Sequence, residues 1–515
     1  MRRGSPMDVI VVGGGPVGLM TAALLNAAGV DVEVYERESA PVEQTRGSTV
    51  HPRTLEVLTM LETGDGRRIS DVLVEQGQRL PRMHYATLPA QLDYSSLDTP
   101  FPFVLMVSQW RTEQALAEYL RYRGVPMHYG AEVTAVEQSV DEVAVRVGGG
   151  RRIAARYLVG ADGAHSLVRK AAGIGFTGTL PDQVAFVADV ELTEPIDAPR
   201  FFWRPEAGHA NVVPMAGARA RVFGIRAEDT GLTAEQVRRR QAEPFTLTEL
   251  SDALNRICGD DCGVLSASWL SRTSNSSRHA TTYRIGRVMI VGDAAHVHLP
   301  AGGQGLNTGL QDAGNLAWKL AAEVHGWAPD RLVVGEAAYD TERRPVAQRL
   351  VADTQAQDAL MHTFSPAGAS LRELFSGFIA RDGEVAAQLS GWLSGLALAY
   401  PRPEGAHSLV GTRAPDLRLQ HGSLFHALRP DRFLLLDLTV DLSLTDLRSG
   451  RLEVRHAPRP TGSGRAAWDG VQAVLIRPDG YVAHATSNLT GLTEAIAEWT
   501  EPSHLMPAAR KPSCR

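Results

Sequence analysis

The chain has 515 residues, which is enough for about three domains. Hydrophobic residues make up 44% and charged residues 21%, so the chain can bury several cores, and no apolar run reaches the roughly 18 residues of a membrane-spanning helix. The net charge of -6 at pH 7 and the pI near 6.3 do not favour nucleic acid or an anionic membrane as a partner.

The first segment predicts a nucleotide-binding fold. Residues 8–12 form a short apolar strand, residues 13–18 fit the pattern G-x-G-x-x-G, and a helix follows. A second strand over residues 31–35 ends at Glu36, which lies 36 − 15 = 21 residues after Gly15. In this order, glycines let the backbone approach a pyrophosphate and the helix N-terminus faces the charge of that group. The acidic side chain accepts hydrogen bonds from the ribose hydroxyls. A tight structural turn is the alternative, and the spacing of the acid argues against it.

Two arginines follow this fingerprint. Arg37 could indicate the 2′-phosphate of NADP, but Glu36 would repel that phosphate, so an ADP group with a free ribose, as in FAD or NAD, fits better. Arg46 lies in a polar loop over residues 45–54, from which a guanidinium could reach a phosphate or a ring edge. From spacing alone, a solvated arginine is favoured at that position.

The next segment predicts further strands beside the nucleotide fold. Residues 80–102 carry little pattern and predict two short strands, whereas residues 109–120 predict a helix. Residues 132–147 alternate apolar and polar side chains, which predicts an antiparallel pair. A strand over residues 156–160 then leads through Asp162 into an Asp-Gly turn at a helix start.

A separate β-sheet is predicted by residues 184–190, 210–214 and 221–226. The aromatic cluster at residues 201–203 lies on this sheet or beside it, and for any single ring ordinary packing is favoured over ligand contact. A helix over residues 246–256 follows, with the spacing of a capping box at its start, and is expected to lead back towards the nucleotide-binding part.

The three cysteines, Cys258, Cys262 and Cys514, form an odd and sparse set. Such a set argues for a reducing, cytoplasmic location and against a disulfide framework. The pair Cys258 and Cys262 has no second Cys or His pair nearby, so reduced thiols are favoured over a metal or redox site.

Residues 286–320 predict a second ligand-binding turn. A buried strand over residues 287–291 ends at Asp293, a loop rich in glycine follows, and a helix begins near Leu306 and Asn307. A helix N-terminus carries unpaired N–H groups and partial positive charge, so it suits an anion. The segment HVH at residues 296–298 alternates like a ligand pair, but without a third partner local support of the loop is favoured over a metal site.

The last part of the chain predicts helices, a linker and a small α/β unit. Residues 336–355 and 371–398 are mainly helical, and residues 401–415 are a linker rich in proline and glycine. The small unit has predicted strands over residues 432–438, 471–477 and 481–485, a hairpin turn at 478–480 and a helix over 489–499.

Three motifs in this order resemble those of the class A flavoprotein aromatic hydroxylases, the p-hydroxybenzoate hydroxylase type: GGGPVG from Gly13, GADGAHSLVR from Gly160 and GDAAHVHLPAGGQGLN from Gly292. The last two are much more specific than the first. The resemblance covers about residues 9–344, and the C-terminal part is similar to the thioredoxin-like appendage of the longer members. Within the family, the chain resembles the aromatic polyketide hydroxylases and the rifampicin monooxygenases.

The resemblance implies an α/β fold with a Rossmann-like FAD-binding domain, an inserted β-sheet substrate domain and a C-terminal thioredoxin-like domain. The FAD-binding domain would comprise residues 1–180 and, together with a helical segment, residues 275–400. The substrate domain would comprise residues 181–274, and the C-terminal domain residues 412–515.

The implied cofactors are FAD and NAD(P)H, and no metal is implied. The residues that match the cofactor contacts of the family are Gly13, Gly15, Pro16, Val17, Gly18, Glu36, Arg37, Arg46, Gln109, Val133, Asp162, Asp293, Pro300, Gly303, Gly305, Leu306 and Asn307. The aromatic substrate is expected at Phe201, Trp203, Phe223 and Pro300, and the sheet over residues 201–226 and the loop over residues 80–102 are expected to shape its pocket. No catalytic base is identified.

The implied activity is hydroxylation of a polycyclic aromatic, polyketide-like substrate. The resemblance implies that NAD(P)H would reduce the flavin, that dioxygen would add to give a flavin C4a-hydroperoxide, and that its distal oxygen would attack the ring. Because the cofactor carries the difficult step, neither a catalytic triad nor a metal is required. Dioxygen and the aromatic substrate are the expected partners, and a homodimer is also considered.

Other functions are weighed against this one. Baeyer–Villiger-type oxygenation and inactivation of an aromatic antibiotic use the same chemistry. A flavin-dependent halogenase would need a WxWxI-type segment, whereas Trp203 is followed by Arg204 and Pro205. A flavin-binding module without turnover belongs to a different class, and the intact Asp-Gly and Gly-Asp motifs argue against it.

Overall fold

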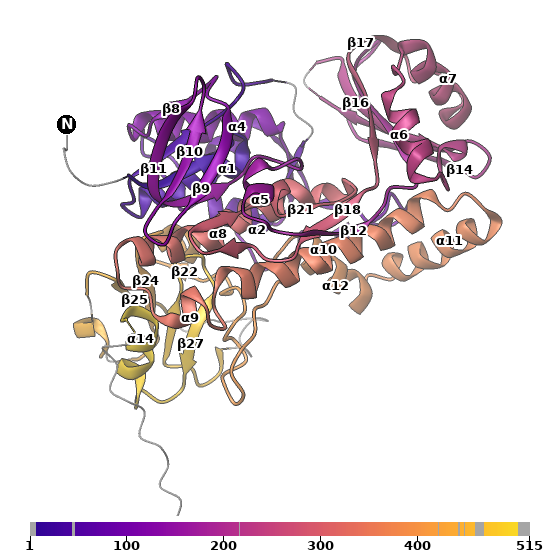
Figure 1. Ribbon diagram of the computed structural model, residues 1–515. Helices are drawn as coiled ribbons and strands as arrows, with labels where there is room; N and C mark the ends of the chain where they lie inside the picture. Colours follow the sequence, from indigo (N-terminus) through magenta and orange to yellow (C-terminus); the bar gives the residue numbers. More distant parts are fainter. Residues whose placement is uncertain are drawn as a thin grey trace, which may run out of the picture.

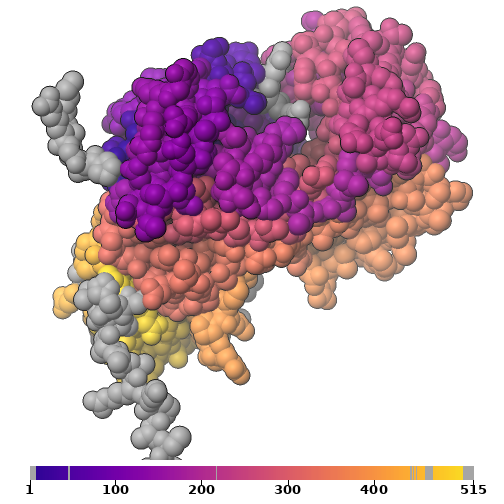
Figure 2. Space-filling model, in the orientation of Figure 1, coloured from indigo at the N-terminus to yellow at the C-terminus, as the bar shows by residue number. Residues whose placement is uncertain are grey.

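The computed structural model describes residues 7–43, 47–215, 217–420, 422–440, 443–447, 449–458 and 468–502. In Figure 1, the purple N-terminal part and a pink part built on a second sheet lie above the salmon and orange helices, and a yellow C-terminal part lies below the left end of these helices. In the space-filling view, the purple N-terminal part and the pink part stand next to each other on the orange residues of the helical segment (Figure 2).

An eight-stranded sheet organises the N-terminal part. Strand β1 (Met7–Val12) pairs in parallel with β2 (Val32–Tyr35) on one side and with β11 (Arg151–Gly160) on the other. Strand β20 (Val288–Ile290) pairs in parallel with β11, although more than a hundred residues separate them in the sequence. The sheet therefore brings the ends of β1, β11 and β20, where the three sequence motifs begin, to one edge.

The predicted antiparallel pair and the predicted helices are present around this sheet. Strands β9 (Val133–Gln138) and β10 (Val143–Val147) pair with each other, and β10 continues the sheet beside β11. Helix α1 (Pro16–Ala27) packs against α8 (Gln304–Val324) and against α4 (Gln109–Tyr122). Helix α8 begins at Gln304, earlier than predicted, because a short turn of 3-10 helix already shapes the glycine-rich loop before it.

The second sheet is antiparallel and has five strands. Their order is β14 (Arg200–Arg204), β15 (Gly208–Pro214), β16 (Arg219–Arg226), β13 (Val184–Leu192) and β17 (Val264–Ser274). The sequence predicted β13, β15 and β16. One face of the sheet packs against α7 (Leu247–Cys258), where Leu250 and Leu254 are fully buried. Helix α7 therefore covers this sheet, and the expectation that it leads back to the nucleotide-binding part was wrong.

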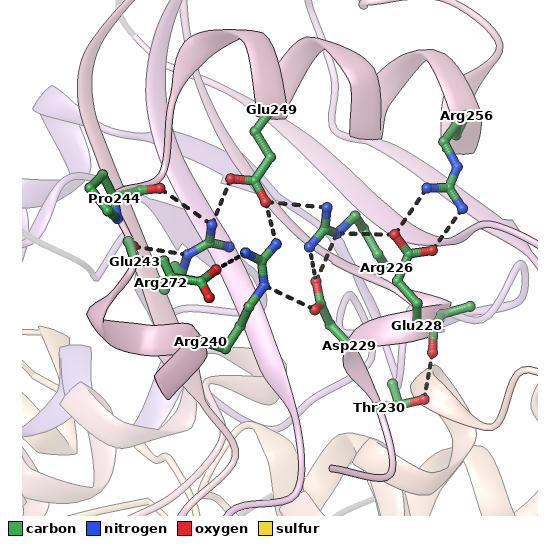
Figure 3. Close-up of polar contacts among 11 residues, drawn as sticks. Arg226, Glu228, Asp229, Thr230, Arg240, Glu243, Pro244, Glu249, Arg256 and Arg272 are labelled. Atoms are coloured by element: carbon green, nitrogen blue, oxygen red, sulfur yellow. Dashed lines mark hydrogen bonds and ion pairs between the residues drawn. The ribbon is translucent and has the colours of Figure 1, made fainter. Parts of the chain in front are cut away.

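An ion-pair network holds the two outer helices, α6 (Ala234–Ala242) and α7, on the sheet (Figure 3). Glu249 of α7 accepts from Arg272 at 2.6 Å and also pairs with Arg226 and Arg240. Its backbone N–H donates to Thr246, the N-cap, as predicted, but its side chain turns to the arginines. Only half of the predicted capping box therefore forms.

Long helices connect the parts. Helix α10 (Tyr339–His362) is followed by α11 (Pro366–Ala380) and α12 (Glu384–Leu393). A three-stranded sheet is formed by β12 (Phe176–Thr179), β18 (Ser277–Ala280) and β21 (His296–Val297), and its strand β18 contacts α10. The remaining short elements are β3 (Thr49–Val50), α2 (Pro52–Leu58), α3 (Ile69–Gln76), β4 (Gln78–Leu80), β5 (Arg82–His84), β6 (Gln91–Asp93), β7 (Val104–Met106), β8 (Met127–His128), α5 (Leu167–Ala171), β19 (Arg284–Ile285) and α9 (Asp330–Val333).

The C-terminal part contains a four-stranded mixed sheet with the order β25 (Leu452–His456), β24 (Phe433–Asp437), β26 (Ala473–Ile476) and β27 (Val482–Thr486). Strands β24 and β25 are parallel and the other pairs are antiparallel. Helix α14 (Leu492–Thr500) follows, and β22 (Arg418–Leu419), β23 (Gly422–Ser423) and α13 (Leu424–Ala427) precede the sheet. Within the described ranges, the apolar length needed to cross a bilayer is not reached by any helix.

Buried charges join the C-terminal part to the central helices. Arg477 donates to both carboxylate oxygens of Glu342 at 2.6 and 2.9 Å and also contacts Asp479. Lys319 of α8 donates to the same Glu342 at 2.6 Å. Each of these side chains is at most 3% exposed, and buried charges are tolerated only when they are paired.

Candidate functional site

A cavity of about 1060 Å³ lies where the three sequence motifs meet the five-stranded sheet. Its lining comes from segments far apart in the sequence, including the loop after β1, the loop after β11, the turn after β20 and the inner face of β14, β15 and β16. The carboxyl ends of parallel strands are where α/β sheets bind ligands. The cavity is at the upper end of the roughly 300–1,000 Å³ of most small-molecule sites.

The glycines of the first motif have different roles. Gly13 has a φ of +109°, and a Cβ on it would lie 2.2 Å from the carbonyl oxygen of Ala161. A Cβ on Gly18 would lie 1.9 Å from the Gly13 carbonyl oxygen. Gly15, in contrast, lines the cavity, and a Cβ on it would meet nothing within 4 Å. Gly13 and Gly18 therefore bring the strands and the helix together, and Gly15 is the glycine that leaves space for a ligand.

Pro16 and Val17 line the cavity beside Gly15, at the N-terminus of α1. Glu36 lies behind this turn, where its Oε2 accepts a hydrogen bond from the Gly14 N–H at 2.5 Å. The carboxylate is thereby fixed next to the loop. Arg37 forms an ion pair with Glu38 at 3.3 Å, is 71% exposed and does not line the cavity.

Two other residues predicted to contact the cofactor, Val133 and Asp162, lie outside the cavity lining. Val133 is buried at the start of β9. Asp162 accepts hydrogen bonds from the Ser166 hydroxyl at 2.5 Å and from the Val168 N–H at 3.0 Å, so it holds the start of α5. Its neighbours Ala161 and Gly163 line the cavity, whereas Val133 and Asp162 do not.

The loop before α8 forms another wall. Pro300, Gly303, Gly305 and Leu306 line the cavity. Asn307 does not, because its buried side chain holds the loop from behind. Its Oδ1 accepts from the N–H of His51 at 2.8 Å, and its Nδ2 donates to the carbonyls of Thr49 and Gly303 at 3.0 and 2.8 Å. The N-terminus of α8 therefore points at the cavity in a fixed position.

Asp293 lies on the turn after β20, is exposed and lines the cavity. The two histidines that follow have separate roles. His296 Nε2 lies 2.7 Å from the Oδ2 of Asp312, whose Oδ1 accepts from Arg343, and all three side chains are buried. His298 lines the cavity, and burial lowers its pKa to about 4. Over the described ranges, no three His, Cys, Asp or Glu side chains are grouped to hold a metal ion.

Gln109 closes the cavity at the start of α4. Its Oε1 accepts from the Gly47 N–H at 3.1 Å, and its Nε2 donates to Glu113 at 2.7 Å. Burial raises the pKa of Glu113 to about 7. The predicted contact Arg46 lies outside the described residues.

The five-stranded sheet supplies an aromatic wall with Phe201 and Phe223. The structure does not bring the third predicted aromatic residue, Trp203, into the cavity. The Trp203 indole donates to the Met361 carbonyl at 2.7 Å and packs against the ring of Phe364. It belongs to the contact between the sheet and the long helix α10.

Several polar residues of the wall were missed from the sequence. They are Thr49, His84, Asn211, Arg221 and His298. For Asn211 a signal existed, since it is a polar residue inside the otherwise apolar strand predicted over residues 210–214. His84 and Arg221 lie in the two segments expected to shape the pocket, residues 80–102 and 201–226, but no motif distinguishes them there. Thr49 and the cavity-lining position of His298 follow only from the three-dimensional arrangement.

Taken together, the cavity suits an elongated anionic ligand beside an aromatic one. The N-termini of α1 and α8 both reach it, and each offers unpaired N–H groups and partial positive charge. The open space before Gly15 and the carboxylate of Glu36 fit an ADP group, as the motif predicted.

Comparisons with known proteins agree with this arrangement. Residues 6–354 match the family described as FAD binding domain, and residues 407–503 match the aromatic-ring hydroxylase C-terminal family. The chain is 39% identical to an uncharacterized aromatic compound monooxygenase of Bacillus subtilis (strain 168), covering 93% of this chain and 94% of the relative. It is 37% identical to 12-dehydrotetracycline 5-monooxygenase/anhydrotetracycline 6-monooxygenase of Streptomyces rimosus, covering 96% and 99%. The solved structure of anhydrotetracycline hydroxylase from Streptomyces rimosus superposes with a TM-score of 0.83 at 35% identity, covering 96% and 99% of the two chains.

Proposed function

Because this chain belongs to the family of FAD-dependent aromatic-ring hydroxylases, which are monooxygenases, we propose that it hydroxylates a polycyclic aromatic substrate of the polyketide type, with NAD(P)H as reductant. One observation carries the proposal: a single cavity of about 1060 Å³ is lined at once by the glycine loop of the dinucleotide motif, the N-terminus of α8 and the aromatic wall of the five-stranded sheet. A cofactor and an aromatic ring can therefore meet there.

Gly15, Pro16 and Val17 would hold the pyrophosphate of FAD, with Glu36 taking the ribose hydroxyls. Gln109, Asp293 and the loop from Pro300 to Leu306 would surround the flavin and its ribityl chain. Gly13, Gly18 and Asn307 would act indirectly, through packing and loop position. The contacts proposed for Arg37, Arg46, Val133 and Asp162 rest on the motifs alone.

Bound FAD would supply the activation of dioxygen after reduction by NAD(P)H. The chain's own residues bind, orient and exclude water. The unpaired N–H groups at the start of α8 would stabilise negative charge placed before them. Phe201 and Phe223 would hold the flat substrate. Because His298 is neutral near pH 7, it adds no positive charge to the cavity wall formed by the segment before α8.

The tetracycline substrates named for relatives support the polycyclic class. Baeyer–Villiger-type oxygenation of a ketone is the alternative outcome of the same chemistry. The domain limits given above, the thioredoxin-like character of the C-terminal part, the cytoplasmic location and the homodimer stay predictions.

The purified protein tests the proposal directly. We expect a flavin absorbance spectrum and oxidation of NADH or NADPH that anhydrotetracycline or another polycyclic phenol accelerates. The product should gain one oxygen atom from ¹⁸O₂, and its NMR spectrum separates a new hydroxyl from a ring-expanded ester. A protein that cannot be reconstituted with FAD would overturn the proposal, and oxidation that no phenol accelerates would overturn the substrate class.

A further inference from the structure

Three side chains form a row across the cavity wall. Phe201 of β14 is paired in register with Asn211 of β15, and Asn211 is paired with Phe223 of β16. All three line the cavity. Residues directly opposite each other on adjacent strands project from the same face, with Cβ atoms about 4.5–5.5 Å apart. The wall therefore presents one amide between two phenyl rings.

A buried histidine fixes the orientation of this amide. The Nε2 of His209 lies 2.8 Å from the Oδ1 of Asn211, and His209 is fully buried. Because a carbonyl oxygen can only accept, Nε2 carries the hydrogen. Burial, with the nearby His362, lowers the pKa of His209 well below its usual value, so the ring is neutral and Nδ1 carries no hydrogen. The Oδ1 of Asn211 is thus occupied, and its Nδ2 is left as the donor.

The histidine is itself held in place. Its ring lies 5.5 Å from the ring of His362, measured between centroids. The Nδ1 of His362 lies 2.6 Å from the carboxylate of Asp358, which also accepts from Gln183 at 2.9 Å. Since these groups are packed between β15 and α10, the imidazole of His209 cannot turn away from Asn211 without disturbing both.

The Nδ2 of Asn211 has no acceptor within hydrogen-bond distance among the residues that the structure describes. A donor that faces a cavity unpaired is satisfied by water until a ligand replaces it, and a ligand without an acceptor there loses that hydrogen bond. Sites built in this way discriminate strongly against analogues that lack the matching oxygen.

We propose that Asn211 determines substrate specificity by donating a hydrogen bond to a keto or phenolate oxygen of a fused aromatic ring system placed between Phe201 and Phe223, and that His209 is the positioning residue for its amide. The inference rests on the proposed function and deepens it. The hydrogen bond from Asn211 favours polycyclic substrates that carry an oxygen on the edge facing the sheet over hydrocarbons of the same shape.

The test uses four variants of the FAD-loaded full-length protein with anhydrotetracycline as the probe. Asn211→Leu removes the donor at similar volume, and Asn211→Asp replaces it with an anionic acceptor. His209→Leu removes the group that orients the amide, whereas His209→Gln keeps an N–H that can reach Asn211. Asn255→Leu, the same change on the exposed side of α7, is the matched control.

Binding is measured from the change in flavin absorbance on titration, and turnover from steady-state kinetics. We expect Kd to rise roughly 10- to 100-fold in Asn211→Leu and at least as much in Asn211→Asp. His209→Leu should raise Kd roughly 3- to 10-fold, and His209→Gln should restore it to within about twofold of the unmodified protein. The increase should appear in KM more than in kcat, while the flavin spectrum without probe stays unchanged.

The outcomes separate the two proposals. If the unmodified protein binds FAD but not anhydrotetracycline, the proposed substrate class fails and this inference fails with it. If the probe binds and Asn211→Leu and Asn211→Asp stay within twofold of the control variant, only the inference is overturned. If the Asn211 variants weaken binding but both His209 variants behave alike, the positioning role of His209 is overturned.

Discussion

Gly303 and Thr49 are in contact across the cavity wall: a Cβ added to Gly303 would lie 1.9 Å from the Thr49 hydroxyl oxygen. Gly303 is also the residue before α8 and has a φ of +64°, a conformation that side chains with a Cβ rarely adopt. The start of α8 therefore depends on a glycine at this position for two independent reasons.

Gly303→Ala should displace the loop from Pro300 to Leu306 and weaken FAD binding by a factor of ten or more, because both the clash and the backbone strain must be relieved. The measurement is the Kd of FAD by fluorescence titration of the apoprotein. Gly150→Ala is the matched control, since Gly150 also has a positive φ, of +89°, but a Cβ there would meet nothing within 4 Å. Equal effects of the two changes would contradict the role given to the Thr49 contact.

Glu36→Gln should weaken FAD binding about tenfold, because a neutral amide accepts more weakly from the Gly14 N–H and pairs less well with ribose hydroxyls. Glu38→Gln serves as the control, since the Glu38 side chain is half-exposed and pairs with Arg37 on the surface. The same titration gives both values. An unchanged Kd in Glu36→Gln would remove this carboxylate from the cofactor site.

Arg477→Met should lower the free energy of unfolding by about 3–5 kcal/mol, because it leaves the buried carboxylates of Glu342 and Asp479 without their main partner. Arg256→Met, which breaks an ion pair between side chains about half-exposed, should cost at most about 1 kcal/mol. Urea unfolding followed by circular dichroism measures both. A loss below about 1 kcal/mol for Arg477→Met would show that the buried cluster does not depend on this charge.

Stability should fall as the pH is lowered from 6.5 to 4. His51 is buried, His84 and His298 are partly buried, and burial lowers the pKa of each to about 4. In the unfolded chain their pKa values return to about 6.5, so between these limits the unfolded state binds more protons and folding loses free energy. The contribution is complete above pH 6.5 and is lost as the pH falls towards 4.

The pH dependence is measured by urea unfolding at several pH values. Replacing one of these residues, for example His298→Gln, should reduce the slope of the free energy of unfolding against pH between pH 4 and 6.5. The reason is that one group fewer takes up a proton on unfolding. A slope that is the same in the variant would show that His298 does not titrate in this range.

Local sequence patterns predicted most of the fold. The strands and glycine turns of the three motifs were found, and the family they indicated is confirmed by the two family matches. Strand β17 was missed because it is mainly polar and lies half-exposed at the edge of its sheet. Helix α6 was missed because it buries a single residue, Val237, and so has no apolar stripe.

The candidate site could be predicted only in part. Spacing identified the glycine motif, but not that Gly15 faces the cavity while Gly13 and Gly18 serve packing. Likewise, Phe201 and Trp203 project from the same face of β14, yet only Phe201 lines the cavity. Trp203 is covered by helix residues about 160 positions later in the chain, and such long-range contacts leave no local pattern.

The buried charges of α10 have a consequence for engineering within the family. Glu342 pairs with Arg477 of the C-terminal part, and its neighbour Arg343 pairs with Asp312, which holds His296 beside the cavity. A chimera that joins the first part of one relative to the C-terminal part of another would separate these partners. Exchanges should therefore transfer the segment from the turn after β20 through α8 and α10 together with the turn around Arg477, so that both sets of paired charges come from one parent.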